Sequence, residues 1–209
     1  MSDIIVFGVP FSPFVRTVRM VLEEKGVAYQ LVPSKPHSDE IYALHPFGKV
    51  PAFQHGDVCL CETIAISTYI DDVFDGPALI PADAVARAHM YKWISLFNDN
   101  CAPAMGLGLI VQRLVMPKMG GEPDEARITE SIPKARHCLE VYDGALTGKD
   151  WLVGDTIGLA DLFALPMFAY LPMIPEGDEL LKGLPNLMRW YDAIVARDSF
   201  INTVANFDL

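Results

Sequence analysis

A serine stands near the start of the chain, where a short apolar segment gives way to a helical pattern. The segment PFSPFVR (10–16) follows the apolar run 4–7 and opens a region whose apolar residues recur at helical spacing. Ser12 suits a helix N-cap, and the proline after it suits the first helical position. A helix N-terminus also stabilises anions, and it favours a thiolate over a thiol. The pattern therefore fits either a simple cap or a thiol-binding site.

Two further segments carry polar groups next to predicted strands. Val50-Pro51 lies before a strand, and a cis peptide bond there would turn the backbone of Val50 outward, where it could pair with a peptide ligand. Glu62-Thr63 opens a later helix, and an acidic residue followed by threonine is favourable at a helix start. The same pair could grip an amino-acid group, with the carboxylate on its ammonium and the hydroxyl and N–H on its carboxylate.

The cysteines show no metal or redox spacing. Cys59, Cys61, Cys101 and Cys138 form no C-x-x-C, and no histidine pair has zinc-ligand spacing. We expect reduced thiols, buried or half-buried, in a cytoplasmic protein, and no metal site.

Charge and hydropathy exclude several classes of function. The 209 residues carry a formal net charge of −11, which disfavours nucleic acid and anionic membranes as partners. The N-terminus has no positive charge before its short apolar run and does not resemble a signal peptide. The longest apolar stretch, 157–175, contains Asp161 and three prolines, so a buried core helix fits it better than a membrane helix.

The first part of the chain alternates strands and helices. We expect strands at 4–7 and 28–32, a hairpin of strands at 52–54 and 58–61 around His55-Gly56-Asp57, and helices at 13–25, 38–44 and 63–74. This order builds a small mixed sheet with helices on both faces. It predicts an α/β domain over residues 1–76.

The rest of the chain is helical in period. A linker is expected at 77–84, followed by an all-helical domain over 85–209. Its helices are predicted at 84–116, 124–146, 159–173 and 185–195, and a glycine-rich break over 117–123 separates the first two.

Taken in order and spacing, the motifs resemble a known family. SPFVRTVR (12–19), HPFGKVPAF (45–53) and ETIAISTYI (62–70) are similar to the glutathione-binding half of cytosolic glutathione S-transferases. MPKMGGEPDEA (116–126) and WLVGDTIGLADL (151–162) resemble their helical half, so the likeness covers nearly the whole chain. The nearest type is the serine type, similar to the plant phi class and its bacterial relatives. The resemblance implies a thioredoxin-like βαβαββα domain, an all-helical domain, and a cytoplasmic homodimer.

The resemblance also implies roles for individual residues. Ser12 would donate a hydrogen bond to the glutathione sulfur, and Val50, before Pro51, would pair its backbone with the cysteinyl unit. Lys49 and His37 would lie near the glycyl carboxylate, and Glu62 and Thr63 would hold the γ-glutamyl end. A hydrophobic electrophile would bind between the domains, and the candidates for its pocket wall are Phe11, Met105, Leu109, Arg113 and Met116.

The chain departs from the family pattern at three positions. His45 stands where asparagine is usual, and Thr63 replaces serine but keeps the hydroxyl. Gly158 stands where a serine or threonine cap is expected, so only Asp161, three residues later, supplies its half of a capping box.

The function implied is conjugation of the glutathione thiolate to electrophilic small molecules, with glutathione as co-substrate and no metal. Two alternatives stay open. A glutathione-dependent thiol–disulfide oxidoreductase or peroxidase needs a cysteine at the first helix, and Ser12-Pro13-Phe14-Val15 contains no sulfur. A non-catalytic glutathione-binding or scaffold protein could use the same fold.

Overall fold

A computed structural model describes residues 3–204. Their contacts divide the chain into two compact units. The first contains residues up to Ile80 together with the segment that begins at Ala196, and the second contains Pro81–Val195. The change from the first unit to the second thus falls within the stretch 77–84 that the sequence marks as a linker.

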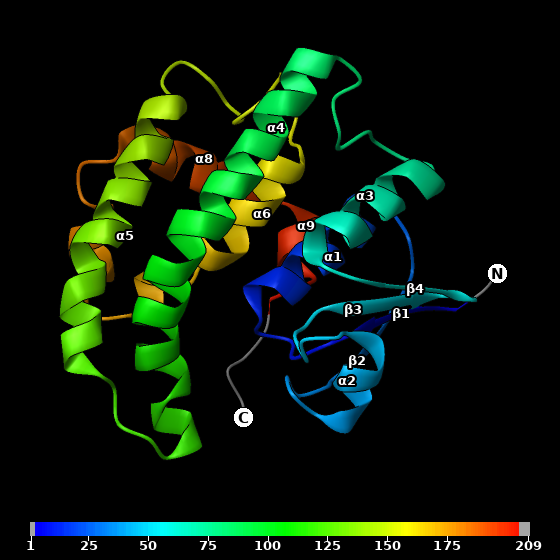
Figure 1. Ribbon diagram of the computed structural model, residues 1–209. Coiled ribbons are helices and arrows are strands. Elements are labelled where there is room, and N and C mark those ends of the chain that lie inside the picture. The colour runs from blue at the N-terminus through cyan, green and yellow to red at the C-terminus, as the bar shows by residue number, and fades with distance from the viewer. Residues whose placement is uncertain (1–2, 205–209) are drawn as a thin grey trace. The chain divides into compact units, whose positions relative to one another are not determined.

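The first unit is built on a four-stranded sheet with the order β2-β1-β3-β4. β1 (Ile4–Phe7) pairs parallel with β2 (Gln30–Val32) and antiparallel with β3 (Ala52–His55), which pairs antiparallel with β4 (Val58–Cys61). The helices α1 (Pro13–Glu24) and α3 (Thr63–Val73) cover one face, and α2 (Asp39–Leu44) lies at the other (Figure 1). This is the thioredoxin-like βαβαββα order that the sequence predicts, with β2 beginning two residues later than expected.

Local sequence explains where these helices begin and which face they bury. The Ser12 hydroxyl accepts a hydrogen bond from the N–H of Val15 and caps α1, and Ser38 caps α2 in the same way through Ile41. The apolar stripe of α1 is fully buried, and it contains Val15, Val18, Val21 and Leu22. Burial of such a stripe supplies most of the stability of a short helix.

A short C-terminal helix belongs to the first unit and was not predicted. Within α9 (Asp198–Ile201), Ser199 donates to the carboxylate of Glu24 on α1, which also binds the guanidinium of Arg197 at 2.6 Å. Burial alone would raise the pKa of Glu24, but the hydrogen bonds from Arg197 and Ser199 lower it. Arg19 of α1 donates to the carbonyl of Thr203 at 3.2 Å. These contacts join residues that lie far apart in sequence, so local patterns gave no sign of them.

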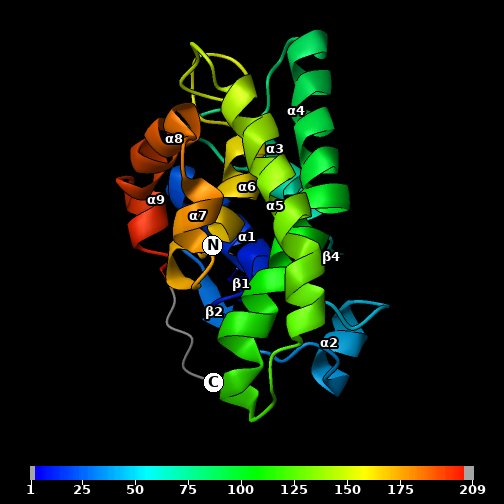
Figure 2. The same ribbon diagram turned by 90° about the vertical axis from the view of Figure 1, so that its left-hand side faces the viewer.

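The second unit is all-helical, as predicted. Its helices are α4 (Ala84–Leu96), η1 (Phe97–Val115), η2 (Pro117–Met119), α5 (Glu125–Ala145), α6 (Leu159–Phe168), η3 (Leu171–Met173), α7 (Gly177–Leu181) and α8 (Pro185–Val195). The green helix formed by α4 and η1 runs beside α5 in both views (Figure 1, Figure 2). The predicted helices at 124–146 and 185–195 are confirmed, the one at 84–116 forms as α4 followed by η1, the one at 159–173 ends at Phe168, and the short α7 is an addition.

The long first helix of this unit changes its hydrogen-bonding pattern halfway. From Phe97 to Val115 it is a wide π-type helix, and it closes with the N–H of Met116 donating to the carbonyl of Val111. Pro103 lies inside it and lacks the N–H that an α-helix needs. The side-chain amide of Asn100 donates to the carbonyl of Leu96, and that of Gln112 to the carbonyl of Leu107. Side chains that enter the backbone ladder in this way distort a helix.

The core of the second unit is α6, whose ten residues are all buried. The apolar stretch 157–175 is thus broken into α6 and η3, in keeping with its prolines. In the described part of the chain, one helix, Ala84–Val115, is long and apolar enough to cross a membrane by those measures alone. A core helix of a soluble protein satisfies the same test.

Candidate active site

Strand register brings the candidate glutathione-binding segments to one edge of the sheet. Phe7, the last residue of β1, pairs with Val32 at the end of β2 and with Ala52 at the start of β3. Ala52 in turn pairs with Cys61, the last residue of β4. Pro51 directly precedes Ala52 and Glu62 directly follows Cys61, while Ser12 and His37 come five residues after Phe7 and Val32, so all four segments leave or enter the sheet at this end.

Two helix N-termini also adjoin this edge. α1 begins at Pro13 and α3 at Thr63, each a short step after its strand has ended. The first N–H groups of a helix carry partial positive charge and lack partners within the helix. Anionic groups, such as a thiolate or a carboxylate, are therefore favoured here.

Ser12 is half-buried at the start of α1. Its backbone N–H donates to the carbonyl of Val9 at 3.0 Å, and its carbonyl accepts from the N–H of Arg16 at 2.9 Å. The hydroxyl accepts from the N–H of Val15 at 3.5 Å, a long bond that leaves its own proton available to donate. Ser12 is thus an N-cap that can also donate to a ligand, and the two interpretations are compatible.

Val50 is held close to the same helix through a glycine. The Val50–Pro51 peptide bond is cis. Gly8 lies between Val15 and Val50, and a Cβ at Gly8 would come within 2.5 Å of Val15 and 3.1 Å of Val50. Gly8 also has a φ of 152°, which glycine adopts far more readily than other residues. Gly8 therefore lets the segment before β3 approach the first turn of α1.

Glu62 has a buried histidine beside its carboxylate. The side chain of His45 is 2 % exposed, and its Nε2 lies 3.5 Å from Oε1 of Glu62. Nδ1 of His45 accepts from the N–H of Phe47 at 3.1 Å, which leaves Nε2 as the nitrogen that carries the proton toward Glu62. Glu62 is 64 % exposed and Thr63 is buried, so the carboxylate is free to meet a ligand while His45 supports it from behind.

The loop before this edge orders His37. Its backbone N–H donates to the carbonyl of Gly48, and its ring Nδ1 lies 3.0 Å from the hydroxyl of Tyr42. Gly48 contacts both rings, and a Cβ there would come within 2.8 Å of each. His37 and Lys49 are exposed, and each neighbours Gly48 in sequence or through a contact. The two residues therefore come from backbone positions that lie close together, where either side chain could meet a carboxylate.

The residues expected to line an electrophile pocket differ in how deeply they are buried. Phe11 is half-buried beside Ser12, and Met116 is half-buried after η1, where its methyl group lies against Gly121. Met105 and Leu109 of η1 are completely buried. Core side chains have the same burial, so the role of these four residues in a pocket stays a prediction.

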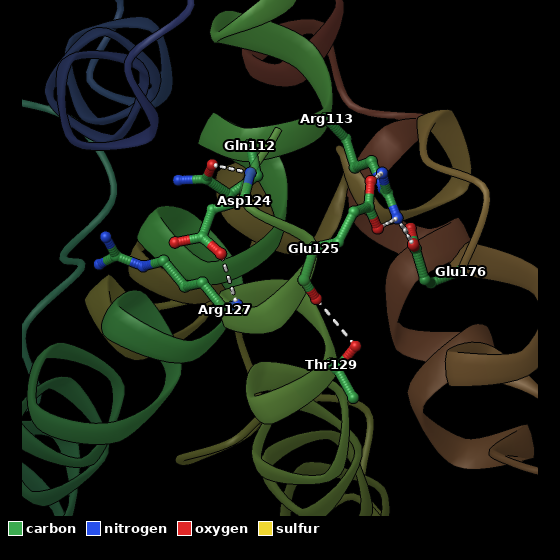
Figure 3. A network of polar contacts seen from close by, with 7 residues as sticks. All are labelled: Gln112, Arg113, Asp124, Glu125, Arg127, Thr129 and Glu176. Atoms are coloured by element: carbon green, nitrogen blue, oxygen red, sulfur yellow. Dashed lines mark hydrogen bonds and ion pairs between the residues drawn. The ribbon is translucent and has the colours of Figure 1, made fainter. Parts of the chain in front are cut away.

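Arg113 is engaged by two carboxylates. Its guanidinium binds Glu125 of α5 at 2.6 Å and Glu176 at 2.5 Å (Figure 3). Hydrogen bonds to Glu125 and Glu176 raise the pKa of Arg113, so its charge is secured. The residues next to Arg113 and Glu125 in sequence are also joined, because the side-chain oxygen of Gln112 accepts a hydrogen bond from the N–H of Asp124. The sequence did not predict this arrangement, and any role of Arg113 toward a ligand has to be compatible with it.

Comparison with known proteins agrees with this geometry. Residues 6–78 match a family described as glutathione S-transferase, N-terminal domain, and residues 85–198 match glutathione S-transferase, C-terminal domain. The chain belongs to the glutathione S-transferase family. Glutathione S-transferase 3 of Zea mays is 34 % identical over 100 % of this chain and 96 % of its own length. These matches confirm the family, its fold and the phi class that the motifs indicated.

Solved transferase structures have the same fold. The apo form of glutathione S-transferase III has a TM-score of 0.88 and 34 % identity, covering 100 % of this chain and 98 % of its own. Glutathione S-transferase I from maize, solved with an atrazine glutathione conjugate, has a TM-score of 0.85 and 28 % identity, covering 97 % of this chain and 96 % of its own.

The contact between His45 and Glu62 was not predicted from the sequence, where His45 was noted only because it replaces the usual asparagine. An imidazole can accept an N–H two residues onward, as an asparagine side chain does, and its second nitrogen can also reach a neighbour. That second nitrogen is the feature that could have pointed to Glu62.

Proposed function

We propose that this transferase conjugates glutathione to electrophilic small molecules, with the thiolate formed at Ser12. The main support for this proposal is the strand register, which brings the segments with Ser12, Val50-Pro51 and Glu62-Thr63 to the same end of the sheet. Two helix N-termini at the same edge supply the positive potential that an anionic ligand needs.

The chemistry of these residues fits the groups of glutathione. The carboxylate of Glu62 suits the γ-glutamyl ammonium, and the Thr63 hydroxyl with the α3 N-terminus suits its carboxylate. The backbone of Val50 would pair with the cysteinyl unit, and Lys49 and His37 would attract the glycyl carboxylate. This set holds an extended, zwitterionic tripeptide at both ends and in the middle.

Ser12 acts on the thiol in this proposal. A free thiol of this type has a pKa of about 8.5, and lowering it by about two units takes about 2.7 kcal/mol. A hydroxyl that donates to the thiolate contributes about 1.5–3 kcal/mol, and the α1 N-terminus adds to it. The thiolate then attacks an electrophilic carbon, a sulfur–carbon bond forms, and any leaving group departs with its electron pair. No protein nucleophile is needed.

The electrophile would lie in a pocket for whose wall Phe11, Met105, Leu109, Arg113 and Met116 remain the candidates. We further propose that the protein acts as a cytoplasmic homodimer, with residues 1–76 and 85–209 as its two domains. The structure of the maize relative with an atrazine glutathione conjugate supports this class of electrophile.

Ser12→Ala tests the assignment. Glutathione affinity, measured by calorimetry, should change little because the binding groups remain. The pKa of the bound thiol, followed by thiolate absorbance, should rise by about one to two units. Conjugation at neutral pH should fall by about tenfold to a hundredfold, with partial recovery at high pH.

A matched control separates chemistry from capping. Asp83 caps α4 through the N–H groups of Val85 and Ala86, so Asp83→Ala removes a cap without touching the candidate site. It should lower stability by about 1 kcal/mol and leave the thiol pKa unchanged. If Ser12→Ala behaves like Asp83→Ala, Ser12 is only an N-cap. The non-catalytic binding alternative would then be favoured.

A further inference from the structure

Two cysteines that the proposed reaction does not use meet inside the helical unit. Cys101 lies on η1 and Cys138 on α5, and they are only 2 % and 8 % exposed. Both line one cavity beside Tyr142, and the two thiols interact with each other closely enough to shift each other's pKa. This is an isolated thiol pair, since Cys59 and Cys61 both lie on β4 in the other unit. Cys59 is exposed rather than buried or half-buried as we expected, because β4 forms an edge of the sheet.

The packing of the two helices explains why these cysteines meet. η1 and α5 run side by side in opposite directions (Figure 1, Figure 2). A Cβ at Gly108 would come within 2.1 Å of the Ser131 hydroxyl, so the helices approach closely there. Cys101 lies seven residues before Gly108, and Cys138 lies seven residues after Ser131. Both cysteines therefore lie on the same side of this contact, and both line one cavity together with other residues of η1 and α5.

A cavity of about 700 Å³ gives small molecules access to the pair. Both cysteines line it, together with Asp99, Arg127, Glu130, Lys134 and His137. Lys134 is paired with Glu130 at 2.6 Å. The cavity has a mixed polar and apolar lining and is wide enough for a small peroxide to reach the thiols. All of the residues that line it belong to the second unit, whereas Ser12 belongs to the first.

The two thiols are chemically unequal. The hydrogen bond with Cys138, together with burial, raises the pKa of Cys101 far above its ordinary value. The hydrogen bond with Cys101 lowers the pKa of Cys138, against the opposing effect of burial. Cys138 is also the more exposed of the two, at 8 % against 2 % for Cys101, so a peroxide in the cavity meets Cys138 first, and Cys101 is the partner that resolves it.

We propose that Cys101 and Cys138 form an oxidisable dithiol, which a hydroperoxide converts into a disulfide that joins η1 to α5. In the first step the Cys138 thiolate attacks the hydroperoxide. A sulfur–oxygen bond forms, the oxygen–oxygen bond breaks, and the departing oxygen takes up a proton, leaving a sulfenic acid. In the second step Cys101 attacks the sulfur of Cys138. The sulfur–sulfur bond forms and water leaves with the thiol proton. The two thiols supply the two electrons that reduce one hydroperoxide.

Peroxide treatment followed by mass spectrometry tests this site. The full-length protein is reduced, freed of reductant and treated with hydrogen peroxide at one equivalent per chain. The intact mass should fall by two hydrogen atoms, and the number of alkylatable thiols should fall from four to two. Tryptic mapping should place the bond between Cys101 and Cys138, and dithiothreitol should reverse it. Because Ser12 has no part in the reaction, Ser12→Ala should form the bond at the same rate.

Variants identify the order of the steps. Cys101→Ser should stop at a sulfenic acid on Cys138 that dimedone traps, and Cys138→Ser should form no bond. The double variant Cys59→Ser/Cys61→Ser is the matched control and should react as the wild type does. A disulfide through Cys59 or Cys61, a bond between two chains, or four free thiols after treatment would overturn the proposal. Phenylarsine oxide bridges neighbouring thiols and so tests the pair without oxidising it. It should bind the Cys59→Ser/Cys61→Ser variant as it binds the wild type, and loss of binding in that variant alone would contradict the assignment.

Discussion

Asp161 is the best-connected buried charge of the helical unit, and its removal should destabilise the fold. Its carboxylate is completely buried. Oδ1 accepts from the N–H of Leu152 at 3.0 Å and from the indole Nε1 of Trp190 at 2.7 Å, and Oδ2 accepts from the N–H of Gly158 at 3.0 Å. One side chain thus ties the loop before α6, the first residue of its cap, and α8.

The expected cost of Asp161→Ala follows from these bonds. Each buried donor left without an acceptor costs about 1–3 kcal/mol, so three of them cost about 6 kcal/mol at mid-range. Burial raises the pKa of Asp161 from an ordinary value of 3.8 to about 6, against the hydrogen bonds that lower it. Removing a charge held in this unfavourable state returns about 3 kcal/mol at neutral pH. A net loss of about 3 kcal/mol remains, larger than the loss of a simple helix cap.

The pH dependence provides a second, independent check. Because the folded pKa lies above the unfolded value, the folded state binds the proton more tightly. The contribution of this group to stability is therefore fully present below pH 3.8 and is lost as the pH rises through about 6. Asp161→Asn does not titrate at this position. The free energy of unfolding of the wild type should therefore rise, relative to Asp161→Asn, by about 1.4 kcal/mol between pH 7.5 and pH 5.

Urea unfolding followed by far-ultraviolet circular dichroism measures both effects. Asp161→Asn keeps an oxygen for Leu152 and Trp190 but turns an N–H2 toward the N–H of Gly158, so its loss at pH 7.5 should be smaller than that of alanine. A flat difference between wild type and Asp161→Asn across pH would refute the shifted pKa. An unchanged unfolding midpoint for Asp161→Ala, with lower turnover per folded molecule, would show that its role is not structural.

Three further predictions concern the candidate site and the assembly. Glu62→Gln should raise the KM for glutathione about tenfold or more, because the charge-assisted hydrogen bond between the carboxylate and the ammonium is worth about 1.5–3 kcal/mol; an unchanged KM would mean that another residue holds the amino group. His45→Ala should raise that KM by about fivefold with little change in kcat, while His45→Asn, which still accepts from the N–H of Phe47, should lose less; equal effects of both would place the role of His45 in its Nε2 alone. Light scattering at micromolar concentration should give twice the chain mass of 23.1 kDa, and a stable monomer would contradict the homodimer.

Much of the fold could be predicted because its signals are local. Ser12-Pro13 marks the start of α1, Ser38 the start of α2, and the His55-Gly56-Asp57 turn the hairpin of β3 and β4. Each signal acts through neighbours in sequence, by a cap, a fixed φ or a turn. The strand order then follows from few alternatives, and it leads the candidate site residues to one edge of the sheet.

The parts that could not be predicted depend on contacts between distant residues. Glu176 reaches Arg113 across 63 positions, and Arg197 reaches Glu24 across 173. A charged residue at helical spacing looks the same in sequence whether it faces a ligand or a carboxylate of another helix. The change of η1 to a wide helix had a visible cause in Pro103, but its extent depends on the side chains of Asn100 and Gln112 that bond to its backbone.

The backbone of Glu62 gives an argument for function that is separate from the family resemblance. Its φ is 69°, a conformation that costs a residue with a side chain about 1–3 kcal/mol when the surroundings force it. Glycine would end β4 and start α3 at the same place without that cost. A carboxylate is present there instead, 64 % exposed and supported by the buried ring of His45. The described contacts of this carboxylate with other side chains are limited to His45, so the strained conformation favours the proposed role of Glu62 in holding the amino group of glutathione. A helix cap such as Ser12 has a structural reason of its own, so the backbone of Glu62 is the stronger argument for the proposed binding site.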